Sequence, residues 1–197
     1  VYHRKQYLIV RIIGGSKSGI IIHAPQNLPV RPTTDRSKES LFNILENKLD
    51  WEGLICLDLF TGTGNISYEL ASRGVAEITS VDKDFGCVRF VKETAVKLGF
   101  KQIQVRKQDV FVYLKSETKT YDLIFADPPY ALDKIVDLSS LVFEKGLLSK
   151  TGYLIIEHGS HLDLSSQSGF FEGRKYGQST FSFFRNPNTH QEIIPNP

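Results

Sequence analysis

The amino-acid sequence predicts an α/β fold, with a doubly wound, mostly parallel sheet, an antiparallel C-terminal edge and a small N-terminal β-hairpin and helix. Two observations carry this prediction. From residue 54 onward, apolar segments of strand length alternate with helical segments, which is typical of a parallel sheet covered by helices on both faces. Near the C-terminal end, two β-rich segments flank Gly177, as expected for an antiparallel pair at one edge.

The N-terminal elements follow from turn and capping residues. Residues 11–13 and 20–23 are rich in isoleucine and bracket the glycine-rich stretch 14–19, which predicts a β-hairpin. Residues 34–48 have helical spacing and begin with Thr and Asp, two residue types that cap helices.

The core elements alternate in type, and each ends at a residue that breaks it. The strands are apolar runs, and three of the helices stop before Gly74, Gly99 and Gly146. The predicted parallel strands cover 54–60, 77–82, 103–105, 121–126 and 152–157, and the edge pair covers 170–175 and 179–184. The predicted helices cover 66–73, 88–98, 110–114 and 135–143.

The composition fits one globular domain. The chain has 197 residues, of which 41% are hydrophobic and 23% charged, and this balance excludes a disordered or collagen-like chain. No apolar run approaches the roughly 20 residues that a membrane span needs. With only two cysteines, a disulfide framework and a cysteine-rich zinc site are excluded. We therefore expect a reducing, cytoplasmic setting, because no signal peptide is recognisable either.

The predicted organisation has four parts. We expect an extension or non-native start, then a hairpin and helix, then the main domain and a tail; these parts cover 1–9, 10–50, 51–185 and 186–197.

The charge is distributed unevenly. Residues 1–38 contain seven Lys and Arg but only one acidic residue, whereas the rest of the chain has a net negative charge. A basic arm on a mildly acidic body suggests an anionic partner, and nucleic acid is the leading candidate. A solvated basic surface is the alternative interpretation.

A glycine-containing loop follows the first core strand. Residues 57–65, Leu-Asp-Leu-Phe-Thr-Gly-Thr-Gly-Asn, place two glycines between a strand and a helix. In a doubly wound fold, ligands bind at the carboxyl ends of the strands, and glycines let the backbone approach a cofactor. A plain tight turn is the alternative, but the nearby acidic residue favours a cofactor site.

A second acidic residue, Asp82, ends the next strand. Its carboxylate can accept hydrogen bonds from both hydroxyls of a ribose, as in nicotinamide dinucleotide sites. Two features disfavour a nicotinamide dinucleotide. Ser67 stands where the third glycine of that loop would be, and Asp58 suits a cationic group better than a pyrophosphate.

The fourth core strand ends in Asp127-Pro128-Pro129-Tyr130. The two prolines stiffen the turn and hold the carboxylate and a nearby carbonyl as fixed acceptors. This arrangement suits an exocyclic amine, whose N–H groups donate, and Tyr130 offers a flat surface on which a base can stack. A strand-ending turn with a packed tyrosine is the alternative.

The remaining candidates fit structural roles better. Cys56 lies in a predicted strand and Cys87 near a helix start, which indicates packing. The histidines show no metal-ligand spacing, so we expect no metal site. Trp51 is expected to cover the core.

The order of these motifs resembles a class I, Rossmann-like S-adenosylmethionine-dependent methyltransferase that modifies amines. The matching segments are LDLFTGTGN, VDKD, QDV and DPPY, in that order. Three N-terminal segments narrow the resemblance to the RsmD family: RIIGG, RPTTDR and ESLFN. The similarity extends from residue 10 to residue 184.

The resemblance implies roles for individual residues. Asp82 would hold the ribose of the cofactor, Lys83 would flank the adenine, and Asp109 would meet the adenine amine. The implied cofactor-binding residues are Asp58, Phe60, Thr61, Gly62, Gly64, Asp82, Lys83, Asp109 and Val110. The implied catalytic residues, which would hold the target guanine, are Asp127, Pro128, Pro129 and Tyr130. The candidate RNA contacts in the basic arm are Arg11, Lys17, Arg31 and Arg36.

The activity that the resemblance implies is methylation of the exocyclic N2 amine of a guanine in 16S (small-subunit) ribosomal RNA. The product of the cofactor would be S-adenosylhomocysteine, and no metal would be needed. The expected partner is 16S ribosomal RNA or the small ribosomal subunit, and we expect a monomer without membrane contact. Three alternatives stay open: a methyltransferase for adenine N6 or cytosine N4 in DNA or another RNA, a nicotinamide-dependent oxidoreductase, and a catalytically silent RNA-binding module.

Overall fold

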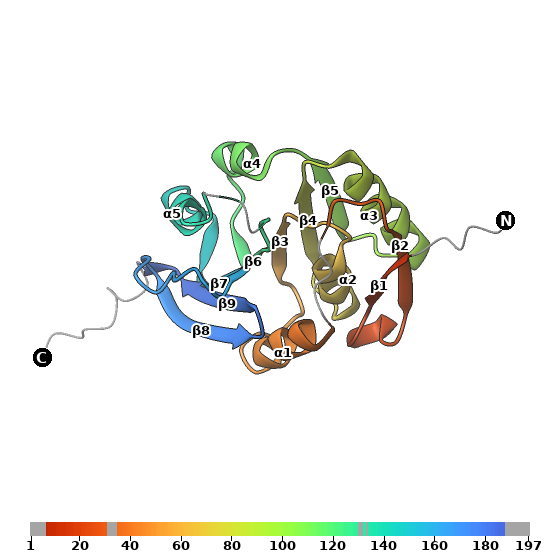
Figure 1. The fold of residues 1–197 in the computed structure, drawn as a ribbon, viewed down its shortest axis with the longest axis horizontal. Helices are drawn as coiled ribbons and strands as arrows, with labels where there is room; N and C mark the ends of the chain where they lie inside the picture. Colours follow the sequence, from red (N-terminus) through yellow and green to blue (C-terminus); the bar gives the residue numbers. More distant parts are fainter. Residues whose placement is uncertain (1–6, 31–34, 130–131, 133, 188–197) are drawn as a thin grey trace, which may run out of the picture.

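A computed structural model describes residues 7–30, 35–129, 132 and 134–187. Its centre is a seven-stranded sheet with the strand order β5-β4-β3-β6-β7-β9-β8 (Figure 1). The strands are β3 (Ile55–Leu59), β4 (Glu77–Asp82), β5 (Ile103–Lys107), β6 (Tyr121–Ala126), β7 (Leu148–Gly159), β8 (Phe170–Tyr176) and β9 (Ser179–Arg185). The first five in the spatial order are parallel, and β9 runs antiparallel to both β7 and β8.

Helices cover both faces of the sheet because its buried strands alternate their side chains between two apolar cores. One core contains Cys56, Phe125 and Ile155 together with side chains of α1 (Asp35–Glu46), α2 (Asn65–Ser72) and α3 (Phe85–Leu98). The other contains the neighbouring strand residues Leu57 and Ile124 with side chains of the remaining two helices, α4 (Val110–Ser116) and α5 (Asp137–Glu144). This period of two places successive residues of a strand on opposite faces.

The parallel strands place their carboxyl ends at one edge of the sheet. The residues directly after β3, β4 and β6 begin at Phe60, Lys83 and Asp127, so the three predicted ligand-contacting segments meet there. The fold class is therefore confirmed: a mostly parallel, Rossmann-like sheet of the class I methyltransferase type, with an antiparallel C-terminal edge.

The N-terminal hairpin forms its own two-stranded sheet. β1 (Tyr7–Arg11) pairs antiparallel with β2 (Ile21–Pro25), and the 3-10 turn η1 (Gly15–Lys17) lies in the connection. In Figure 1 the hairpin lies beside α2. Its connection contacts the C-terminal half of that helix, because the backbone N–H groups of Ile13 and Gly14 each donate to Glu69, at 2.8 Å.

Several boundaries differ from the sequence-based ones. Helix α3 begins at Phe85 rather than 88, because Asp84 caps it by accepting from the Cys87 N–H at 2.8 Å. Strand β7 is longer than predicted and begins at Leu148. The first hairpin strand begins at Tyr7 and ends at Arg11. The predicted strand 11–13 therefore shares only Arg11 with it.

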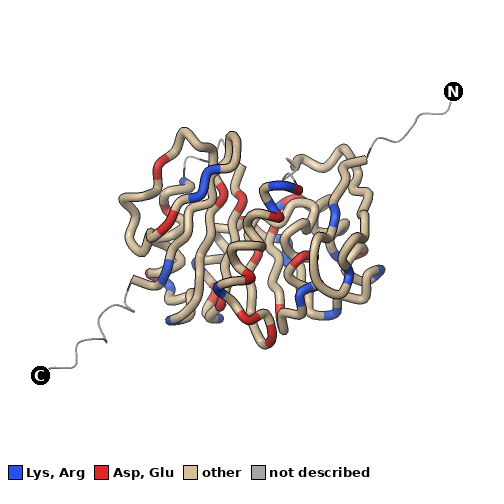
Figure 2. The backbone as a smooth tube through the Cα atoms, turned by 90° about the horizontal axis from the view of Figure 1, so that it is seen from below, with Lys and Arg blue, Asp and Glu red and all other residues tan. Residues whose placement is uncertain are grey.

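No helix within the described residues is long and apolar enough to cross a membrane. Seen from below, positions of Lys and Arg and positions of Asp and Glu are interspersed along the backbone of the described residues (Figure 2).

Candidate active site

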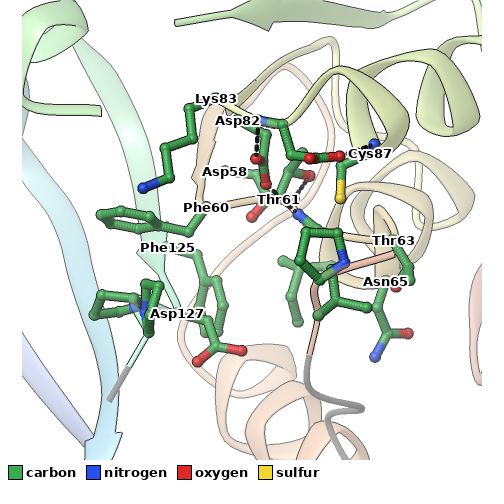
Figure 3. A pocket seen from close by; sticks show the side chains of 17 residues that line it. Asp58, Phe60, Thr61, Thr63, Asn65, Asp82, Lys83, Cys87, Phe125 and Asp127 are labelled. Carbon is green, nitrogen blue, oxygen red and sulfur yellow. Dashed lines mark hydrogen bonds between the residues drawn. The ribbon is translucent and has the colours of Figure 1, made fainter. Parts of the chain in front are cut away.

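A cavity of about 530 Å³ lies at the carboxyl ends of β3, β4 and β6. It brings together most of the predicted cofactor-binding and catalytic residues that the structure describes (Figure 3). Those in its wall are Asp58, Phe60, Thr61, Gly62, Asp82, Lys83, Asp127, Pro128 and Pro129. Its size lies within the range of small-molecule sites, roughly 300–1,000 Å³.

The loop after β3 has a strained backbone. Phe60 adopts φ 59°, which is uncommon for a residue with a side chain. Gly64 adopts φ 80°, and a Cβ there would lie 2.6 Å from the Tyr68 ring, so this position accepts only glycine. Gly64 is not part of the cavity wall, and it is required by the packing of the loop against α2.

Asp58 is a buried acid at the floor of the site. Its side chain accepts from Thr61 Oγ1 at 2.6 Å and from Ser67 Oγ at 2.5 Å. Only 2% of its surface is exposed, and burial raises the pKa of its carboxyl to about 6 although both hydroxyl donors act in the opposite direction. A cationic ligand group would stabilise the ionised form.

Asp82 is held in place by two backbone donors. Its Oδ2 accepts from the Gly62 N–H at 2.9 Å, and its Oδ1 accepts from the Asp84 N–H at 2.8 Å. Each carboxylate oxygen has two acceptor positions, so both oxygens can still accept a hydroxyl. Asp82 thus offers a fixed pair of acceptors of the kind that a ribose diol needs. Figure 3 shows the Lys83 side chain extended beside Phe60.

The Asp127-Pro128-Pro129 segment closes the opposite side of the cavity. Figure 3 shows the Asp127 carboxylate on the far side of the view from Asp82, beneath Phe125. The Asp127 N–H donates to the Leu59 carbonyl at 3.4 Å, which joins the ends of β6 and β3. The next residue of the motif, Tyr130, lies outside the described residues.

Besides Gly64, two predicted cofactor residues are not in the cavity wall. Asp109 caps α4, accepting from the N–H groups of Phe111 at 3.0 Å and Val112 at 3.2 Å. Val110 is buried in the core beneath α4 and α5. Their contact with an adenine stays a prediction.

The predicted RNA-contacting residues that the structure describes are not part of the cavity wall. Arg11 pairs with Asp35 at 3.5 Å, and both side chains are about half exposed. Lys17 donates its backbone N–H to Ser72 Oγ at 2.9 Å and is partly exposed, and Arg36 is exposed. Arg31 lies outside the described residues.

Some wall residues were not predicted from the sequence. Pro29 and Val30 follow the hairpin and reach the cavity from a distant part of the chain, so no local pattern marks them. Asn65 ends the motif LDLFTGTGN, and its place there was a usable signal. Cys87 lines the cavity although it is buried, and burial raises the pKa of its thiol to about 12, which keeps it protonated.

Within the residues that the structure describes, no group of three His, Cys, Asp or Glu side chains has the arrangement of a metal site. The buried His158 contacts Ser182 Oγ through Nε2 at 2.8 Å and the Gly159 carbonyl through Nδ1 at 3.0 Å. Both ring nitrogens therefore have protein partners.

The chain is similar in sequence and in fold to several known proteins. YlbH of Bacillus subtilis is 35% identical over 164 residues, which cover 81% of this chain and 88% of YlbH. The protein named ribosomal RNA small subunit methyltransferase D of Haemophilus influenzae is 30% identical, over 75% of this chain and 78% of its own length. A solved structure of a hypothetical protein from Thermus thermophilus superposes with a TM-score of 0.79 at 30% identity, covering 89% of this chain and 99% of that one.

A family model spans nearly the same segment as the described fold. It is described as "Conserved hypothetical protein 95" and matches residues 10–185, which include both the N-terminal hairpin connection and the whole sheet. The chain belongs to this family, which is the RsmD family that its motifs indicated.

Proposed function

We propose that this protein transfers a methyl group from S-adenosylmethionine to the exocyclic N2 amine of a guanine in small-subunit ribosomal RNA. The observation that carries the proposal is the convergence of the Asp127-Pro-Pro turn with Asp58 and Asp82 in one cavity. The name of the Haemophilus influenzae relative supports ribosomal RNA as the substrate.

The acids of the wall fit the functional groups of the cofactor. Asp82 presents two fixed oxygens that suit the ribose hydroxyls, and the buried Asp58 suits the ammonium group of the methionine moiety. When bound, the cofactor supplies an electrophilic methyl group, so the protein needs only to align the two reactants and exclude water.

Asp127 would act on the target amine. Its carboxylate would accept a hydrogen bond from the exocyclic N–H and favour a pyramidal nitrogen whose lone pair faces the methyl group. It would then take the proton that the amine loses. The prolines support this role because they restrict the backbone on the carboxyl side of Asp127, and Pro128 is itself buried. Tyr130 would provide stacking for the extruded base.

Single-turnover methyl transfer tests the proposal, with radiolabelled cofactor at saturation and 16S ribosomal RNA, small subunits or DNA as acceptor. We expect labelled N2-methylguanosine from RNA, identified by mass spectrometry of the nucleosides. Asp127→Ala should lower the rate by roughly a hundredfold to ten-thousandfold, the range for losing a positioned proton acceptor. Asp127→Asn should retain a trace, and Asp137→Ala, an exposed aspartate on α5, serves as the matched control.

The outcomes separate the alternatives. N6-methyladenine or N4-methylcytosine as the product would replace the guanine assignment with another amine substrate. Absence of transfer to every acceptor, with cofactor binding intact, would leave a binding module. A parent-like rate for Asp127→Ala would remove the amine-methylating mechanism itself.

A further inference from the structure

A buried lysine lies directly behind the wall of the cavity. Lys38 of α1 has a side chain with 0% exposure, and its ammonium lies 2.7 Å from Asn65 Oδ1. Its other two contacts are with the Arg11 carbonyl and Glu69 Oε2, the latter at 3.5 Å. Three acceptors thus match the three N–H donors of an ammonium group.

This contact fixes the orientation of the Asn65 amide. An ammonium group has no acceptor, so the atom that faces Lys38 must be the amide oxygen. The amide nitrogen is then the polar atom that Asn65 can offer to the cavity, and it can only donate. Figure 3 shows Asn65 at the wall of the cavity, on the opposite side of the view from Lys83.

The rest of the wall makes this donor distinctive. The charged side chains of the wall are four carboxylates and one ammonium: Asp58, Asp82, Asp84, Asp127 and Lys83. An anionic group of a ligand would be repelled by the carboxylates and would need hydrogen-bond donors. At Asn65, the contact with Lys38 holds the amide so that its N–H donor is the group left for a ligand.

We propose that Asn65, oriented by Lys38, binds the carboxylate of the amino-acid moiety of the cofactor. This inference rests on the proposed function, because it takes the ligand to be S-adenosylmethionine or its product. Asn65 would contact the ligand, and Lys38 would act through it as a positioning residue. Asp58 would hold the ammonium of the same moiety, so the two charges of the amino acid would meet matched groups.

The substitution Asn65→Asp distinguishes binding from a merely structural role. Aspartate keeps an acceptor for Lys38, and this charge-assisted bond should leave the melting temperature at or above the parent value. It also replaces the donor facing the ligand by a carboxylate oxygen. In contrast, Asn65→Ala removes the acceptor for Lys38 and should lower the melting temperature.

Calorimetry on the full chain measures the effect, with S-adenosylhomocysteine and 5′-methylthioadenosine as ligands. The second ligand lacks the amino-acid moiety. For Asn65→Asp we expect the affinity for S-adenosylhomocysteine to fall at least about tenfold, the scale of a hydrogen bond to a charged group. The affinity for methylthioadenosine should stay at the parent value. Asn47→Asp, the same change at an exposed position, controls for net charge.

Each other outcome overturns the proposal. Parent-like binding of S-adenosylhomocysteine to Asn65→Asp would assign the amide a structural role only. Equal losses for both ligands would show general damage to the cavity. If the parent binds neither ligand, the proposed function fails and the inference falls with it.

A measurement on the parent covers the case in which the variants do not fold. Decarboxylated S-adenosylmethionine keeps the ammonium and the sulfonium but lacks the carboxylate. We expect it to bind at least about tenfold more weakly than S-adenosylmethionine. Equal affinities would overturn the proposal without any substitution.

Discussion

Two buried acids show how differently this protein uses the same chemical group. Glu69, with a side chain that has 0% exposure, accepts from two backbone N–H groups of the hairpin connection and pairs with Lys38 and Arg73. Asp58 is buried as deeply, but its carboxylate accepts from the hydroxyls of Thr61 and Ser67. Within the described residues, no salt bridge reaches Asp58.

The difference lies in charge compensation. The protein itself neutralises Glu69, which therefore joins the hairpin to α2 as a structural element. For Asp58, burial is opposed only by neutral donors and the pKa rises, so a cationic ligand group would stabilise its ionised form. The two buried acids thus differ in the charge of their partners and not in their burial: Glu69, between the hairpin and α2, pairs with two cations, whereas Asp58, in the candidate active site, accepts from two hydroxyls.

The largest loss of stability is expected from breaking the contacts of the buried Lys38, which pairs with Glu69 between the hairpin and α2. Lys38→Met removes the ammonium from Glu69 and Asn65 and should lower the free energy of unfolding by about 3–5 kcal/mol, the range for removing one partner of a buried pair. Arg11→Ala breaks the half-exposed pair with Asp35 and should cost less than about 1 kcal/mol. Urea unfolding measures both, and equal costs would contradict the distinction.

Gly15, in the hairpin connection that packs against α2, provides the next test. Gly15 adopts φ 73°, and a Cβ there would lie 2.0 Å from the Ser72 carbonyl oxygen. A left-handed conformation alone costs a residue with a side chain ~1–2 kcal/mol. Because of the added clash, Gly15→Ala should lower the free energy of unfolding by about 3 kcal/mol in total. Gly19→Ala is the matched control, because Gly19 has φ 84° in the same connection with nothing within 4 Å. Similar costs for both would exclude close packing against α2.

The pH dependence of stability tests the second of the two buried acids, Asp58. The pKa of Asp58 is about 6 in the folded protein and 3.8 as the ordinary value, so between these limits the folded state binds more protons than the unfolded state. The contribution of Asp58 to the free energy of unfolding is therefore greatest below pH 4 and falls by roughly 2–3 kcal/mol as pH rises to 6.

Asp58→Asn removes this titration. Urea unfolding of both proteins from pH 4 to pH 7 should show that the stability of the variant relative to the parent rises across that window. Parallel curves would mean that Asp58 titrates in the folded protein as it does in the unfolded chain.

The smallest expected effect concerns the exposed cations of the N-terminal segment. Lys17 and Arg36 are accessible, unlike Lys38, and each phosphate contact should add about 0.7–0.9 to the slope of log affinity against log salt. Replacing both by alanine should reduce the slope for ribosomal RNA by up to about 2 and leave cofactor binding unchanged. Lys97→Ala, an exposed lysine of α3, should leave the slope at the parent value. A slope unchanged by the double substitution would remove these residues from the RNA contact.

Most strands and helices, and the acids at the strand ends, could be predicted from the sequence because they depend on residues close together in the chain. Period-two apolar runs and glycine stops located the strands, and strand ends are adjacent in any parallel sheet, which placed Asp58, Asp82 and Asp127 at one edge. The same reasoning misplaced the start of α3, since the capping of Cys87 by Asp84 depends on loop geometry.

Other features depend on residues far apart in the chain. The sequence alone determined the alternation of elements, the position of the loop after β3 and the acids at the ends of the strands. Only the tertiary structure decided that Lys38 is buried against Glu69 and Asn65, and that Pro29 and Val30 form part of the cavity wall. Local conformation follows from backbone sterics and periodicity within a short window. The partner of a buried charge is instead set by the packing of segments about 30 residues apart, and no short window contains both groups.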